Sequence, residues 1–222
     1  MNRIELKSQA KQQIKGEIGI LFVISLIIAL ISGIASIVLS LIPFIGGLAN
    51  AIIVTPAFAL SLVQVYLNIT SNAKPSAGDA FIGFDDFWSA FKLNFLVSLF
   101  TFLWSLLFVI PGIIKSFSYS MSMYILAENK GKAALECINE SKLMTNGHKM
   151  DLFVLGLSFI GWALLGAITF GIAFIWVIPY MNATYANAYN SLKPVKAEVV
   201  NEPEVISAKA SVEAVAEETP EN

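Results

Sequence analysis

The stretch that decides the fold is Ile18–Ile42, which reads IGILFVISLIIALISGIASIVLSLI and contains no charged residue. The charge-free run extends to Ala73, over 56 consecutive residues. A second run covers residues 152–192, and residues 93–127 carry a single charge, Lys115. A membrane helix needs roughly 20 apolar residues to cross about 30 Å of hydrocarbon. The sequence therefore predicts an all-α, polytopic transmembrane helical bundle.

Composition excludes the main alternatives. Of the 222 residues, 56% are hydrophobic and only 14% are charged, whereas an average soluble domain has about 25% charged residues. This excludes a soluble globular protein, a disordered chain and a nucleic-acid binder. The single cysteine, Cys137, excludes an intrachain disulfide. The basic N-terminus and the apolar run after it resemble a signal peptide, but the apolar run is much longer than the about 7–15 residues of a signal peptide. We therefore expect an uncleaved first span.

The charge-free runs divide into six predicted spans arranged as three hairpins. The first two are Ile18–Ile42 and residues 48–70, the latter kinked at Pro56. Residues 93–127 would measure about 52 Å as one helix, too long for one crossing. Because Pro-Gly marks a turn, we divide this stretch into spans 93–110 and 111–128. Residues 152–192 hold the last two spans, with their turn at Gly171 or at Pro179.

Lysine and arginine positions set the orientation. With six spans, the N-terminus, the loops 71–92 and 128–151 and the tail share one side, which then holds 13 of the 14 Lys and Arg residues. Excess Lys and Arg mark the cytoplasmic side, so both termini are predicted to be cytoplasmic. A Val-x-Pro motif recurs once in each hairpin, as Val54-Thr55-Pro56, Val109-Ile110-Pro111 and Val177-Ile178-Pro179. The expected organisation is an N-terminal helix (1–17), a membrane domain (18–192) and a tail (193–222).

Short amphipathic helices are expected on the cytoplasmic side. In residues 3–17, a basic stripe (Arg3, Lys7, Lys11, Lys15) lies beside an apolar one (Leu6, Ala10, Ile14). This helix either lies among headgroups, with its basic stripe on anionic lipid, or extends the first span into solvent. Aromatic residues at helical spacing over 81–91 indicate an interfacial helix or an ordinary aromatic belt. Residues 128–151 predict a mildly amphipathic helix that stops at Asn146-Gly147. The acidic tail, 193–222, lacks aromatic residues and is predicted to be disordered.

The sequence contains no recognisable catalytic, cofactor or metal site, and it identifies no substrate. The predicted bilayer core has no ionisable residue, although membrane enzymes and ion-coupled pumps usually need one. His148 is the only histidine, whereas zinc sites need three or four ligands. Glu136, Glu140 and Asp151 lie in a lysine-balanced loop and are expected to be solvated.

Uncharged polar residues within the spans form the remaining candidate site. They belong to the second span (Asn50, Gln64, Asn68), the fourth (Ser116, Ser118, Ser120, Ser122) and the sixth (Asn182, Thr184, Asn187, Asn190). One interpretation is hydrogen bonding between helices, at ~0.6 kcal/mol per pair. The other is a polar path for a neutral solute or a lipid headgroup.

Residues 135–162 carry a longer pattern: Ser141, then Leu143-Met144, Gly147, the basic pair His148-Lys149, Leu152-Phe153 and LSFIGW over 157–162. Further matching segments are Glu5-Leu6-Lys7, Pro111–Lys115 with Tyr119–Met121, Thr169–Ile172 and Trp176–Tyr180. This pattern resembles a bacterial integral membrane family, number 975 among the domains of unknown function, over residues 3–192. The family is also distantly similar to the membrane domain of glycerophosphodiester phosphodiesterases. The resemblance implies a compartment and a topology, but no reaction.

We therefore predict a multi-pass protein of the bacterial cytoplasmic membrane that is not an enzyme and needs no cofactor. It would act as an accessory or scaffold protein. The alternative is a carrier for an uncharged solute or lipid. Expected partners are membrane lipids, with anionic lipid at the N-terminal basic helix, and a membrane-protein partner or a second copy of the chain, but no nucleic acid.

Overall fold

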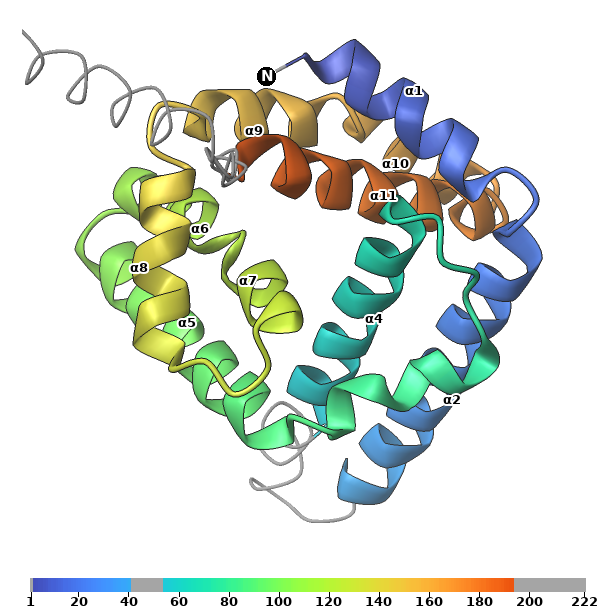
Figure 1. The fold of residues 1–222 in the computed structure, drawn as a ribbon, viewed down its shortest axis with the longest axis horizontal. Coiled ribbons are helices and arrows are strands. Elements are labelled where there is room, and N and C mark those ends of the chain that lie inside the picture. The colour runs from blue at the N-terminus through green and yellow to red at the C-terminus, as the bar shows by residue number, and fades with distance from the viewer. Residues whose placement is uncertain (1, 41–53, 194–222) are drawn as a thin grey trace, which may run out of the picture. The chain divides into compact units, whose positions relative to one another are not determined.

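The computed structural model describes residues 2–40 and 54–193, and all the regular secondary structure in this part of the chain is helical (Figure 1). The helices are α1 (Arg3–Ile14), α2 (Ile18–Ser40), α4 (Thr55–Thr70), the 3₁₀ helix η2 (Ala77–Phe84), α5 (Phe87–Leu107), α6 (Val109–Tyr119), α7 (Ser122–Glu128), α8 (Ala134–Met144), α9 (Lys149–Leu157), α10 (Ile160–Ile168) and α11 (Phe174–Leu192). The all-α prediction is confirmed. The start of the predicted second span and the predicted disordered tail, from residue 194 onward, lie outside the described residues.

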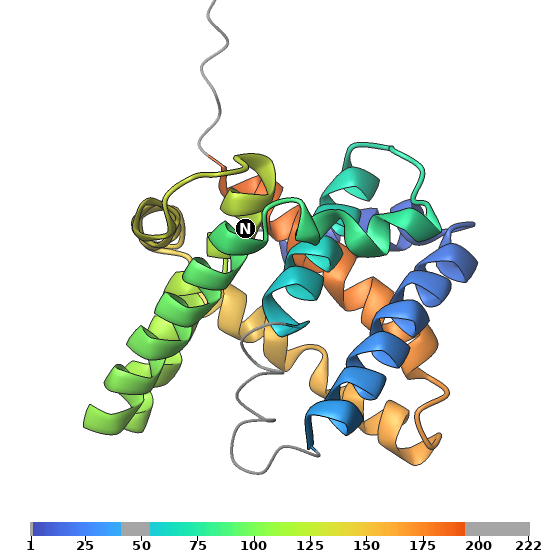
Figure 2. The same ribbon diagram turned by 90° about the horizontal axis from the view of Figure 1, so that it is seen from below.

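Within residues 2–40 and 54–193, three segments are long and apolar enough to cross a membrane: Ile18–Leu39, Phe87–Leu107 and Lys149–Ile168. The chain is thus a helical protein with three candidate membrane spans. Seen from the side, the end of α2, the turn between α5 and α6 and the turn between α10 and α11 all lie at the same end of the helical unit (Figure 2). Side chains at these tips are exposed and apolar; Leu106 is 76% exposed, Phe108 71% and Phe170 99%.

The turn predicted at Pro111-Gly112 is present, three residues earlier than expected. α5 ends at Leu107, Phe108 adopts an extended conformation, and Pro111 lies in the first turn of α6. Proline suits a first helical turn, because the amide proton that it lacks has no partner there. Gly112 lets the two helices approach closely, since a Cβ at this position would lie 2.2 Å from Ser105 Oγ.

The last turn lies at Gly171, one of the two positions that the sequence left open. Gly171 has a φ of +91°, which glycine adopts readily. Its amide donates to the Gly166 carbonyl at 2.8 Å and closes the end of α10. Pro179 instead lies inside α11.

Helix α4 is the central element and packs against η2, α7 and α11. Its buried residues are Pro56, Ala57, Phe58, Leu60, Ser61, Val65, Tyr66, Leu67 and Ile69. By contrast, α2 and α5 bury few residues and leave large apolar side chains exposed. This pattern suits a bundle whose outer helices face lipid.

The prediction of a single interfacial helix over residues 81–91 is wrong. The aromatic residues are divided between η2, which ends at Phe84, and α5, which begins at Phe87. Two contacts explain the break. The Gly83 amide donates to Ser61 Oγ of α4 at 2.9 Å, and the Asp86 carboxylate accepts the Gly131 amide at 2.6 Å. These contacts fix the chain on both sides of Asp85 and interrupt the helix.

Candidate functional site

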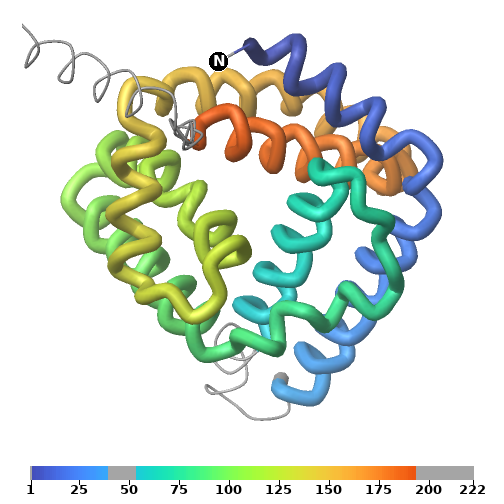
Figure 3. Tube along the Cα trace, in the orientation of Figure 1, coloured from blue at the N-terminus to red at the C-terminus, as the bar shows by residue number. Residues whose placement is uncertain are grey.

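Polar side chains join α11 to α1 and α4. Gln13 Nε2 donates to Asn187 Oδ1 at 3.2 Å, and Asn187 Nδ2 donates to Gln13 Oε1 at 2.7 Å. Asn190 Nδ2 donates to Thr70 Oγ1 at 2.8 Å. We call these four residues the α11 seam; α1 lies beside α11 in the tube view (Figure 3). For Asn187 and Asn190, the structure supports the packing interpretation rather than the polar path.

The other polar residues of the second and sixth predicted spans do not gather into one site. Thr184 Oγ1 donates within α11, to the Tyr180 carbonyl at 2.7 Å. Gln64 and Asn68 are half-buried on α4, and Asn182 is half-buried on α11. Asn50 lies outside the described residues. The structure therefore brings together only part of the predicted set.

Helix α1 uses its apolar stripe for packing within the chain, since Leu6, Ala10 and Ile14 are buried. Two residues of its basic stripe lie on aromatic rings: Lys7 Nζ is 4.4 Å from the centre of the Phe159 ring, and Lys11 Nζ is 5.7 Å from that of Tyr180. The partner that stabilises this short helix is thus α11 and its surroundings.

Lys7 also stabilises a helix break. The fifth predicted span is interrupted at Ser158-Phe159, between α9 and α10. Lys7 Nζ donates to the Ser158 carbonyl at 3.5 Å. The last carbonyls of a helix lack partners within it, and a lysine there can supply a hydrogen bond. Burial, together with nearby Lys11, lowers the pKa of Lys7.

A second break divides the fourth predicted span at Ser120-Met121, between α6 and α7. Ser141 of α8 holds it: Ser141 Oγ donates to the Ser118 carbonyl at 2.8 Å and accepts the Met121 amide at 3.2 Å. Thr145 Oγ1 lies 3.4 Å from the same carbonyl. The sequence did not predict this role for Ser141, although Ser141 opens the family-like pattern and that was the available signal.

A pocket of about 220 Å³ lies beside this break, between α5, α6 and α7. Six of its lining residues carry a hydroxyl or amide group (Asn94, Thr101, Ser116, Tyr119, Ser120 and Ser122), and Leu93, Val97 and Met123 are apolar, but most of the pocket surface is formed by apolar atoms. We call it the hydroxyl pocket. It contains three of the four serines predicted for the fourth span, whereas Ser118 donates to the Ile114 carbonyl. Sequence spacing alone did not separate Ser118 from the other three.

A second groove, of about 240 Å³, lies between α2 and α11. It is apolar apart from Ser25, with Phe22, Leu26, Ala29, Gly171, Phe174, Ile175, Ile178 and Pro179 forming the rest of its lining. Such a surface fits an alkyl chain and offers little to orient a polar ligand. The hydroxyl pocket is therefore the better candidate for specific binding.

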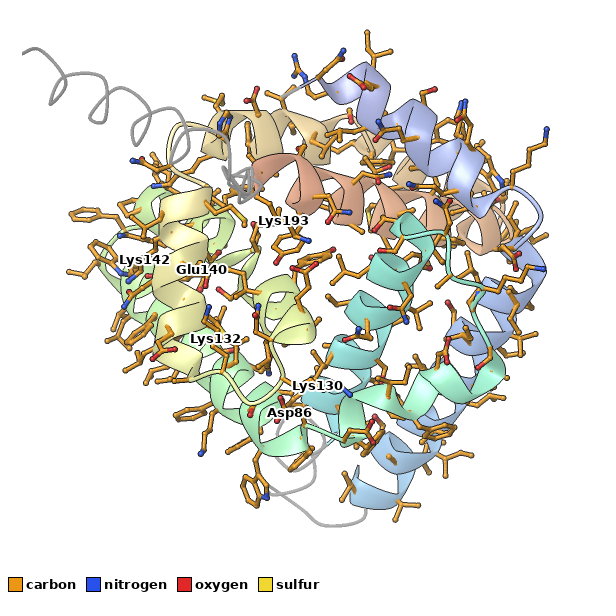
Figure 4. All side chains as sticks on the ribbon, in the orientation of Figure 1. Asp86, Lys130, Lys132, Glu140, Lys142 and Lys193 are labelled. Carbon is orange, nitrogen blue, oxygen red and sulfur yellow. The ribbon has the colours of Figure 1, made fainter. Side chains whose placement is uncertain are left out.

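Charged residues connect the two predicted cytoplasmic loops to each other. Lys130 Nζ lies 3.5 Å from Asp85 Oδ2, and the Gly131 amide binds Asp86, as noted above. Lys132 forms an ion pair with Glu140 of α8, and hydrogen bonding to this carboxylate raises the pKa of Lys132. Figure 4 shows Lys130 near Asp86 at the start of α5. Loops 71–92 and 128–151 thus meet at one end of the bundle.

The remaining titratable residues do not form a cluster. His148 Nδ1 lies 3.2 Å from Asp151 Oδ2, across the first turn of α9, while Glu136 is exposed on α8. Burial raises the pKa of the Cys137 thiol to about 11. Within residues 2–40 and 54–193, no group of three or more His, Cys, Asp or Glu side chains is arranged to hold a metal ion.

Comparison with known proteins identifies a family. The family model described as "Protein of unknown function (DUF975)" matches residues 1–116 and 106–196. No curated protein and no solved structure matches the chain. These comparisons do not support the distant similarity to the phosphodiesterase membrane domain. Because the matched ranges cover most of the sequence, the chain belongs to the DUF975 family of proteins of unknown function.

Proposed function

We propose that this protein is a non-enzymatic accessory or scaffold protein of the bacterial cytoplasmic membrane, with six membrane segments and both termini in the cytoplasm. The observation that carries the topology is the separation of the two ends of the helical unit. The helix tips, whose side chains are apolar and exposed, lie at one end of the ribbon, and the two loops lie at the other (Figure 2). These loops carry charged residues and contact each other. A hairpin that enters and leaves the membrane on one side produces this arrangement.

The charge pattern supports this orientation. The contact between Lys130 and Asp85 supports a placement of loops 71–92 and 128–151 on the same side of the membrane. Loops on the same side are separated by an even number of membrane segments. In this proposal, α5 crosses the membrane away from that side, and α6 together with α7 crosses back. Because most Lys and Arg residues lie on this side, it is the cytoplasmic one.

The accessory role rests on how the polar side chains are used. The α11 seam and the contacts of Ser141 bind helices to one another. Membrane lipids would cover the exposed apolar faces, and anionic lipid would meet the exposed Arg3 of α1 and Lys15, which follows it. A membrane-protein partner or a second copy of the chain would bind the same outer surface.

Single-cysteine accessibility in cells tests the topology. In a Cys137→Ala background, Phe170→Cys at an apolar tip should react with a membrane-impermeant maleimide in intact cells. Asn146→Cys should react only after permeabilisation. Ile24→Cys, at a buried position of α2, serves as the control and should react only after denaturation. Reaction of Asn146→Cys in intact cells would overturn the proposed orientation.

The alternative function is a carrier for an uncharged solute or lipid, and the hydroxyl pocket is the observation that favours it. Purified protein in liposomes separates the two functions. Saturable flux of an uncharged solute, or saturable movement of a lipid between leaflets, would contradict the accessory role. An accessory protein should give the same rate as empty liposomes.

A further inference from the structure

The hydroxyl pocket contains a buried hydroxyl group without a hydrogen-bond partner. Ser122 is 1% exposed, and in the part of the chain that the structure describes its Oγ has no partner. A buried polar group left unsatisfied costs free energy, because it has lost its bonds to water. Ser122 lines the pocket, so a ligand there can supply the missing bond.

The other hydroxyl groups of the pocket define what that ligand must carry. Ser116 Oγ already donates to the Ile113 carbonyl at 2.7 Å, and Ser120 Oγ donates to the Phe117 carbonyl at 2.8 Å. Their oxygens can therefore only accept a further hydrogen bond, while the proton of Ser122 is free to donate one. A group that both donates and accepts matches this set, and an alcohol is the simplest such group.

Charge complementarity excludes an anionic headgroup in the pocket. No residue of its lining, all of which lies within residues 54–193, carries a formal charge at neutral pH. Lys115 of α6 has its Nζ 4.5 Å from the Trp104 ring centre. Lys142 of α8 donates to Asn139 at 3.1 Å, and its Nζ lies 5.7 Å from the ring centre of the lining residue Tyr119 without itself lining the pocket. A phosphate in the pocket would be buried without a cation, which is costly.

The depth and size of the pocket point to a lipid. Trp88 in the first turn of α5 is exposed, and tryptophan is typical of the membrane interface. Asn94 and Thr101 lie about 10 and 20 Å farther along α5, at ~1.5 Å per residue. The volume of about 220 Å³ is below the ~300–1,000 Å³ of sites for drug-sized ligands. It therefore fits the polar end of a lipid whose chains remain outside.

We propose that the hydroxyl pocket binds the hydroxyl end of an uncharged glycerolipid of the diacylglycerol class. Ser122 donates to the lipid, and Ser116 or Ser120 accepts the proton of its free hydroxyl. Leu93, Val97 and Met123 contact the first methylene groups of the chains. This inference rests on the membrane placement proposed above, but not on the accessory role or on the number of segments.

Photo-crosslinking tests the proposal with the full chain in phosphatidylcholine liposomes that contain a little diazirine-labelled 1,2-diacylglycerol. Crosslinks should map to residues 93–101 and 116–123. Ser122→Ala should reduce crosslinking about tenfold, the effect of one lost hydrogen bond. It should leave the Tm unchanged or higher, because it removes a buried hydroxyl that has no partner in the protein. Ser98→Ala, at an exposed serine of α5 outside the pocket, should change neither quantity.

A second variant keeps the test decisive if Ser122→Ala disturbs folding. Ser116→Leu places a larger side chain at an exposed position of the pocket wall and should block crosslinking, with Ser98→Leu as its control. Unlabelled diacylglycerol should compete. Equal competition by triacylglycerol, which lacks a hydroxyl, would reduce the site to an apolar surface and overturn the proposal.

Stronger competition by phosphatidylglycerol would show an anionic site and would also overturn the proposal, as would unchanged crosslinking in Ser122→Ala and Ser116→Leu. The cysteine experiment in cells reports orientation independently, since crosslinking in liposomes does not require a particular orientation. Failure of the lipid site and failure of the topology can therefore be told apart.

Discussion

The α11 seam and the hydroxyl pocket use similar uncharged side chains in opposite ways. In the seam, Asn187 and Gln13 satisfy each other, and Asn190 binds Thr70. In the pocket, Ser122 is more deeply buried than the seam residues but has no partner among the described residues. Apart from Gln13, which lies in the N-terminal helix, both sets come from predicted spans. Polar residues inside a membrane helix thus become packing contacts or a binding surface according to whether a second helix brings a complementary group.

The largest expected effect comes from closing the approach of α5 and α6. A Cβ at Gly112 would lie 2.9 Å from the Ser105 Cα, so backbone must move. Gly112→Leu should lower the free energy of unfolding by about 3 kcal/mol, at the upper end for overpacking. It should also abolish crosslinking in the pocket. Denaturant titration in detergent measures the first effect.

Gly161→Leu is the matched control, since nothing lies within 4 Å of a Cβ at Gly161. If Gly112→Leu unfolds no more easily than this control, the close packing of the hairpin that forms one wall of the pocket is incorrect. The pocket could then no longer be compared with the α11 seam, because its wall would not be formed as described.

Ser141→Ala should have the next largest effect. It removes the acceptor of the buried Met121 amide and one donor to the Ser118 carbonyl. We expect a loss of about 2 kcal/mol, within the range for leaving a buried polar group unsatisfied. The rate at which buried Cys137 reacts with a maleimide measures this loss, because its thiol becomes accessible on unfolding. Ser8→Ala, on the exposed side of α1, should not change that rate.

A double-mutant cycle on Gln13→Ala and Asn187→Ala measures the seam itself. The coupling free energy should be ~0.6 kcal/mol, the average for hydrogen-bonded pairs between membrane helices. The same cycle on Asn94→Ala and Ser116→Ala should give a coupling near zero in lipid without diacylglycerol. Equal coupling in both cycles would remove the distinction between seam and pocket.

Much of the fold follows from the sequence because strong local signals carry it. The charge-free runs predicted the long apolar segments, and Pro111 predicted the turn between α5 and α6. Gly171 was one of two positions left open for the last turn, and Asn146-Gly147 predicted the end of α8. The two helix breaks were missed, since neither Ser120-Met121 nor Ser158-Phe159 contains proline or glycine. Their partners, Ser141 and Lys7, are distant in sequence, so only the folded chain brings them to the breaks.

The sequence predicted which polar residues belong to the candidate site, but not which of them lie together in the pocket. Ser116, Ser118, Ser120 and Ser122 alternate along the chain, and an unbroken helix would spread them over more than one face. The break after Ser120 places Ser122 on α7, while Ser116 and Ser120 remain with α6. Ser118 faces α8 instead, where its carbonyl binds Ser141. Sequence periodicity contains no information about that change of direction.

The smallest expected effect concerns the ion pair between Lys132, which precedes α8, and Glu140 of α8. Both side chains are partly exposed, so Lys132→Gln should cost only about 0.2–1 kcal/mol. Because Glu140 raises the pKa of Lys132 above its ordinary value of 10.5, the pair stabilises the folded chain below that value. The contribution is lost as the pH rises through the higher pKa of the folded state.

The difference in unfolding free energy between the native sequence and Lys132→Gln should therefore be constant from neutral pH to about pH 10 and fall above it. High salt should also reduce it, since exposed charges are screened. Lys74→Gln, at an exposed position of the other loop, should show neither dependence. Ser141 lies on the same helix with its hydroxyl buried, so Ser141→Ala should keep its cost at high salt. If Lys132→Gln and Ser141→Ala respond equally to salt, the Ser141 contacts are exposed, and the wall beside the hydroxyl pocket is not formed as described.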